Sequence, residues 1–137
     1  MSLFKVNELF RSLFSRKKAA LTGVPAVRRM KNYSAQSGYV YQYFYEGQRE
    51  LRSGAEYVFR ISADRKHWTE TSVLIGDTAL RPWQEAHGRE LSSTERYAIA
   101  KIALFQAFDE RPSPAGMKGE IRVRAADVEG IVESLGL

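Results

Sequence analysis

Residues 92–110 read SSTERYAIAKIALFQAFDE, and this stretch decides the fold. Ser92 followed by Glu95 forms a capping box, in which each side chain bonds the backbone N–H of the other residue. The sequence therefore predicts a helix over residues 93–110. Ten apolar side chains leave little of its circumference polar, and a helix that is apolar on most sides is buried. We expect this helix to lie across a sheet.

The chain before this helix has the two-residue period of β-strands. The predicted strands are residues 39–45, 55–63 and 67–75. Turn residues separate them, namely Gly47, Ser53 with Gly54, and the polar run 64–66. Because these connections are short, we expect the strands to form an antiparallel meander.

Three shorter elements complete the predicted domain. Pro82 is expected to open a short helix that stops at Gly88, and residues 120–124 predict a short strand. Apolar residues at helical spacing over 128–135 predict a C-terminal amphipathic helix. The expected fold class is α+β: a single domain with an antiparallel sheet of three or four strands, packed against one long buried helix, with short amphipathic helices at both termini.

The charge is concentrated at the N-terminus. Residues 1–31 hold eight basic residues and one acidic residue, a net charge of +7, whereas the rest of the chain is at −2. We therefore divide the chain into a basic N-terminal amphipathic helix with its connector (1–31, the basic arm) and a single α+β domain (32–137). Such asymmetry predicts a polyanionic partner for residues 1–31, namely nucleic acid, an anionic membrane surface or an acidic protein, with a solvated terminus as the alternative. The candidate anion-binding residues are Arg16, Lys17, Lys18, Arg28, Arg29 and Lys31.

Residues 3–14, LFKVNELFRSLF, have the apolar spacing of an amphipathic helix between Leu3 and Phe14. Such a helix fits a lipid interface, a protein partner or self-association, or docking on the protein's own core. It also resembles an organellar presequence, which is the alternative to the cytoplasmic location that we otherwise expect. No apolar run approaches the ~20 residues of a membrane span, so no integral insertion is expected.

Tyrosines recur at every second residue of the first predicted strand. Tyr39, Tyr41, Tyr43 and Tyr45 share one face, at intervals of roughly 7 Å. They form either part of the core under the helix or an exposed aromatic surface. An exposed row beside arginines would stack nucleic-acid bases, each stack contributing ~1–3 kcal/mol. The periodicity leaves both interpretations open.

Few residues carry chemistry that one sequence can reveal. The absence of cysteine excludes disulfides, thiolate metal sites and a cysteine nucleophile. Two histidines twenty residues apart form no local chelate, and the common hydrolase and nucleotide motifs are absent, so we expect no metal and no cofactor. Asp64 and His67 are weak catalytic candidates because a carboxylate can orient an imidazole, although a solvated turn has the same composition.

These observations favour a non-enzymatic binding module. Our first hypothesis is that it binds a polyanion, nucleic acid, through the basic arm and a Tyr/Arg-rich sheet. The second is a peripheral membrane or protein-complex component anchored by the N-terminal helix. The third is a small ligand-binding or enzymatic pocket between sheet and helix, with His67 as acid–base and tyrosines on the wall.

Overall fold

The computed structural model describes residues 19–137 of this chain. Its centre is one sheet of five strands in the order β1-β2-β3-β4-β5. The strands are β1 Lys31–Ser34, β2 Val40–Leu51, β3 Gly54–Ser62, β4 Thr69–Gly76 and β5 Gly119–Val123. The helices are α2 Asp77–His87, α3 Ser93–Glu110 and α4 Ala125–Leu135, with a 3-10 turn, η1, at Pro114–Met117.

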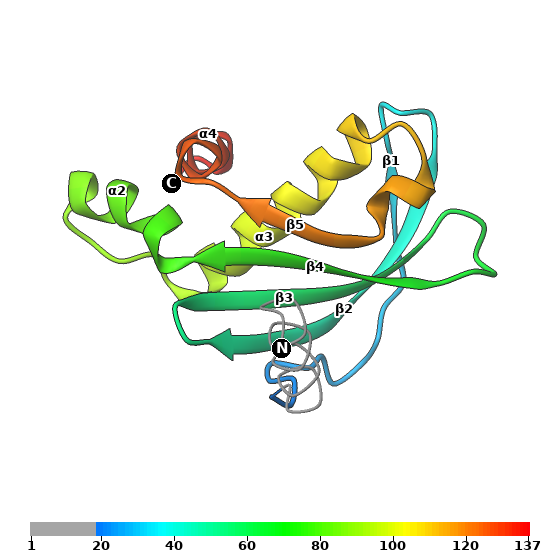
Figure 1. The fold of residues 1–137 in the computed structure, drawn as a ribbon, viewed down its shortest axis with the longest axis horizontal. Coiled ribbons are helices and arrows are strands. Elements are labelled where there is room, and N and C mark those ends of the chain that lie inside the picture. The colour runs from blue at the N-terminus through cyan, green and yellow to red at the C-terminus, as the bar shows by residue number, and fades with distance from the viewer. Residues whose placement is uncertain (1–18) are drawn as a thin grey trace, which may run out of the picture.

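The helices and the sheet enclose one hydrophobic core. Alternate residues of β3, including Tyr57 and Phe59, are buried among Ile99, Leu104 and Phe108 of α3. The helix α4 packs against both α2 and α3, and Figure 1 shows it beside α3 at the β5 edge of the molecule. The strand alternation therefore divides the sheet into a face that packs on the helices and an opposite face.

The segment before β1 pairs with the edge of β2. Thr22 and Gln48 exchange two backbone hydrogen bonds of 2.8 Å each. Next to this bridge, Gly47 has a φ of +136°, and a Cβ built there would lie 2.8 Å from the Thr22 carbonyl oxygen. Only glycine fits this close approach without a shift of the backbone. The chain before β1 is thus held against the sheet by main-chain contacts.

The sheet differs from the prediction of three or four antiparallel strands. It has five strands and is mixed, because β5 pairs with β4 in parallel. The additional strand β1 lies within residues 19–38, where glycine, proline and serine residues predict a connector without regular structure. The parallel pair requires a crossover connection, which α2 and α3 supply, and no local sequence signal reports that geometry.

The predicted strand over residues 39–45 ends too early, and Gly47 shows why. Gly47 does not form a turn; β2 continues through it to Leu51. Tyr45 pairs with Phe59 and Gly47 pairs with Val58, so Glu46 is the extra residue of a β-bulge. A glycine with positive φ suits a bulge as well as a turn, and the sequence alone does not separate the two.

The helices differ from the predicted arrangement of one long buried helix with short helices at both termini. The described residues form three helices, and the predicted helix over 3–14 lies outside them. In α3 both capping-box bonds are present, but Tyr97, Ile102 and Phe105 are only half-buried. The helix is not buried on all sides because it packs on the sheet with one face.

The helix α2 begins earlier than predicted. It starts at Asp77, directly after β4, and Pro82 lies in its interior. Proline lacks the N–H that would bond the Thr78 carbonyl, a cost that usually excludes it from helix interiors. The buried residues Ala79, Leu80 and Trp83 lie on both sides of the proline along the chain. Their packing in the core offsets the missing bond.

Candidate functional site

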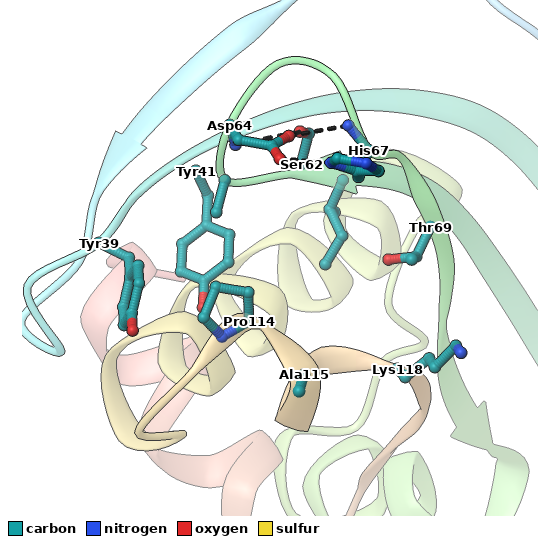
Figure 2. A pocket seen from close by; sticks show the side chains of 11 residues that line it. Tyr39, Tyr41, Ser62, Asp64, His67, Thr69, Pro114, Ala115 and Lys118 are labelled. Atoms are coloured by element: carbon teal, nitrogen blue, oxygen red, sulfur yellow. Dashed lines mark hydrogen bonds and ion pairs between the residues drawn. The ribbon is translucent and has the colours of Figure 1, made fainter.

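A pocket opens where the β3–β4 turn faces η1. Its volume is about 460 Å³, within the range of roughly 300–1,000 Å³ typical of ligand sites. It is lined by Tyr39, Tyr41, Ile61, Ser62, Ala63, Asp64, His67, Thr69, Pro114, Ala115 and Lys118. Figure 2 shows Asp64 and His67 together on one side and Pro114 and Ala115 on the other. The pocket therefore joins segments from both halves of the chain.

The walls of the pocket are fixed by packing and by one buried hydrogen bond. Tyr41 is fully buried, and its ring stacks on Phe108 at a centroid distance of 4.1 Å. The Thr71 hydroxyl donates to the Met117 carbonyl over 2.8 Å, which holds η1 against β4. The Tyr41 hydroxyl is buried and has no hydrogen-bond partner among the described residues. A ligand in this pocket would meet a wall that is already formed.

The β3–β4 turn holds Asp64 and His67 in contact. The Asp64 carboxylate accepts hydrogen bonds from the backbone N–H groups of Lys66 and His67, each over 2.8 Å. Arg65 between them has a φ of +65°, which completes the tight turn. As a result His67 Nδ1 lies 2.6 Å from Asp64 Oδ2. The candidate pair is thus built by the local chain.

The contact changes the protonation of both groups. A hydrogen bond from His67 is the largest cause that holds the pKa of Asp64 well below its usual range. The same hydrogen bond, followed by the charge of Asp64, raises the pKa of His67 above 6.5. The His67 side chain is 85% exposed, so it stands at the rim. An imidazolium has two N–H donors, and Asp64 occupies only one of them.

The pocket is apolar inside, and its rim carries Lys118 and the Asp64–His67 pair, in which the negative charge of Asp64 offsets that of a protonated His67. Tyr41, Ile61 and Pro114 are among the apolar groups of the wall. Lys118 adds a second positive charge to that of a protonated His67. Within residues 19–137, no group of three or more His, Asp or Glu side chains is placed to hold a metal ion. The arrangement suits recognition of an anionic group attached to an apolar body.

The predicted row of tyrosines on β2 does not form a continuous exposed surface. Tyr41 and Tyr43 are buried in the core, Tyr45 is half-buried, and only Tyr39 is exposed, at 39%. The tyrosine row is therefore core packing over much of its length, because α3 covers this face of β2 with Phe105 and Phe108. The predicted stacking surface is corrected accordingly. Two of the four rings, Tyr39 and Tyr41, instead line the pocket.

The predicted anion-binding residues have different positions. Arg28 forms an ion pair with Glu46 and lies over the Phe44 ring, 4.3 Å from its centroid. Arg29 and Lys31 are exposed and line a second, smaller cavity. The remaining candidates, Arg16, Lys17 and Lys18, lie outside the described residues.

Several pocket residues have no counterpart in the sequence prediction. Thr69, Pro114, Ala115 and Lys118 reach the pocket through strand register and the crossover connection. In the sequence, the prolines around η1 predict only a loop. No local motif links that loop to His67.

Comparison with protein-family models, curated proteins and solved structures finds no match for this chain. Within the part of the chain that the structure describes, no helix has the length and apolar character needed to cross a membrane. The chemistry of the pocket is accordingly the best guide to function.

Proposed function

We propose that this protein is a small-molecule binding module whose pocket takes a ligand with an apolar body and one anionic group. The observation that carries this proposal is an apolar pocket of about 460 Å³ with the Asp64–His67 pair and Lys118 at its rim. It corresponds to the third hypothesis from the sequence, a small ligand-binding or enzymatic pocket, with binding proposed and catalysis left out.

The apolar body of the ligand is supported by the walls. Tyr41, Ile61, Ala63 and Pro114 come from two strands, the β3–β4 turn and η1, and they line the same pocket. Burial of about 100 Å² of apolar ligand surface contributes about 2.5 kcal/mol. Because the walls are packed before the ligand arrives, little of that free energy is lost to ordering the protein.

The anionic group is supported by the charges at the rim. Asp64 fixes Nδ1 of His67, so Nε2 is the nitrogen left to donate to a ligand. A hydrogen bond from a charged donor to a carboxylate is roughly twice as strong as one between neutral groups. Lys118 also lines the pocket, at its outer edge, and is positively charged.

The hypothesis that the basic arm binds nucleic acid or an anionic membrane stays a prediction. Three of its six candidate residues lie outside residues 19–137, and Arg28 is engaged by Glu46 and Phe44. The tyrosines buried under α3 no longer support base stacking on this sheet. The pocket is favoured because its residues already lie together.

The first prediction concerns binding of 3-phenylpropionate to the full chain, followed by NMR titration. The His67→Gln variant is expected to bind it roughly tenfold more weakly, because one charge-assisted hydrogen bond is lost. The affinity of the wild type should be highest where the ligand carboxylate is ionised and His67 is protonated, and it should fall as the pH rises through the raised pKa of His67, above 6.5. Asp64 is already ionised in that window, because hydrogen bonds hold the pKa of its carboxyl well below its usual range.

Two controls belong to this prediction. His87→Gln removes the other histidine, which contacts the Trp83 carbonyl on α2, and should leave binding unchanged. The neutral analogue 3-phenylpropan-1-ol should bind more weakly and without the pH dependence. The proposal is wrong if 3-phenylpropionate shifts no resonance of the pocket, or if His87→Gln weakens binding as much as His67→Gln does.

A further inference from the structure

A second cavity lies between α3 and the chain that leads into β1. Its volume is about 160 Å³, and it is lined by Arg29, Lys31, Tyr43, Tyr45 and Tyr97 together with two apolar residues. It shares no lining residue with the larger pocket. At roughly 30 Å³ per molecule of liquid water, the space corresponds to about five waters. It has room for a tetrahedral oxyanion.

Positive charges gather at this cavity. Lys101 of α3 lies beside Lys31, and its Nζ is 5.9 Å from the centroid of the Phe105 ring. Burial, and then the charge of Lys31, lowers the pKa of Lys101. None of the described residues that line the cavity is acidic. Two like charges held side by side destabilise each other, and an anion between them would relieve that repulsion.

The tyrosines supply neutral hydrogen-bond donors. Burial raises the pKa of Tyr43 and the pKa of Tyr45 to about 12, and it also raises the pKa of Tyr97. These phenols therefore keep their protons at any ordinary pH. Their hydroxyls make no hydrogen bond to another residue within 19–137, although their rings pack in and around the core. The donors are available to a ligand.

We propose that this cavity binds a phosphate oxyanion, held by Arg29 and Lys31 of its lining, with tyrosine hydroxyls as additional donors and with the charge of Lys101 beside Lys31. Guanidinium and ammonium groups are the usual protein partners of phosphate, and phenol hydroxyls complete the set of donors. The site gives a physical role to Arg29 and Lys31, two of the residues that the charge pattern of the sequence singles out. The phosphate can be free, part of a small monoester, or part of a nucleic-acid backbone.

The test is a calorimetric titration of the full chain with inorganic phosphate at constant ionic strength. We expect saturable binding that Lys31→Gln weakens by roughly tenfold or more and Tyr45→Phe weakens to a smaller extent. The Lys31→Gln variant should remain folded, since the side chain is exposed and the change removes a like-charge contact with Lys101. Lys66→Gln, at an exposed lysine of the β3–β4 turn, is the matched control and should bind as the wild type does.

Two further ligands identify the source of the phosphate. Phenyl phosphate that binds at least as tightly as inorganic phosphate, with no gain for a ten-nucleotide single strand, supports a small monoester. Tighter binding of the oligonucleotide that is lost in Lys31→Gln supports a nucleic-acid backbone at the same site. The proposal is overturned if phosphate does not saturate the wild type, or if Lys66→Gln and Lys31→Gln bind it equally.

Discussion

Replacement of Phe108 by alanine is expected to lower the free energy of unfolding by about 3–5 kcal/mol. Phe108 is fully buried and lies where α3 meets the first two strands. Its ring stacks on Tyr41 at 4.1 Å and contacts Tyr33 and Tyr43 at centroid distances of 5.8 and 6.4 Å. These rings are rigid, so they would close poorly over the cavity that is left behind. The loss is a large share of the ~5–15 kcal/mol by which domains are stable.

Urea denaturation of the full chain measures this effect. The control is Gln106→Ala, an exposed position on the same helix, which should change stability by no more than about 0.5 kcal/mol. Because Phe108 supports Tyr41, a residue of the larger pocket, Phe108→Ala should also weaken binding of 3-phenylpropionate. Equal stability of the two variants would contradict the packing described for this corner of the core.

Gly54→Ala is expected to be the second severe substitution. Gly54 follows the two-residue turn between β2 and β3 and has a φ of +157°. A Cβ there would lie 2.5 Å from the Ile75 carbonyl oxygen and 2.7 Å from Gly76 Cα. Both neighbours are backbone atoms of β4, so no side-chain rotation relieves the clash. Backbone strain and overpacking together should cost about 2–5 kcal/mol.

Gly130→Ala is the matched control for Gly54→Ala. Gly130 lies within α4, and a Cβ there would meet no atom within 4 Å. Alanine at this position should stabilise the protein by about 0.5–1 kcal/mol, because glycine loses more backbone freedom in a helix. The two midpoints of thermal unfolding should therefore move in opposite directions. A midpoint for Gly54→Ala that is unchanged or raised would show that the close approach at Gly54 is absent.

The features that the sequence predicts correctly are local ones. The capping box at Ser92 and the apolar run after it define α3 from Ser93 to Glu110, because the interactions that start a helix span only a few residues. Asp64 and His67 are three residues apart, and the turn between them brings their side chains together. The residues that make these contacts lie within a few positions of one another in the sequence.

The features that the sequence does not reveal depend on tertiary contacts. The edge strand β1 has one large apolar residue, Tyr33, whose hydroxyl donates to Asp109 over 2.7 Å across the fold. The tyrosine alternation shows which rings share a face, but the position of α3 decides that this face is buried. Lys118 reaches the pocket of His67 only because β5 pairs with β4. No pattern within one strand or helix carries that information.

The parallel pairing of β4 with β5 has a consequence for the order in which the chain assembles. The strands of the meander are joined by short turns, whereas the chain from Gly76 to Gly119 spans about 40 residues. Because of the chain entropy that is lost, closing a loop of that length costs about 2–3 kcal/mol more free energy than closing a short turn. The meander is therefore expected to form early, and the segment from η1 to β5 to dock late. Since that segment supplies one wall of the larger pocket, a ligand would meet a complete site only at the final step of folding.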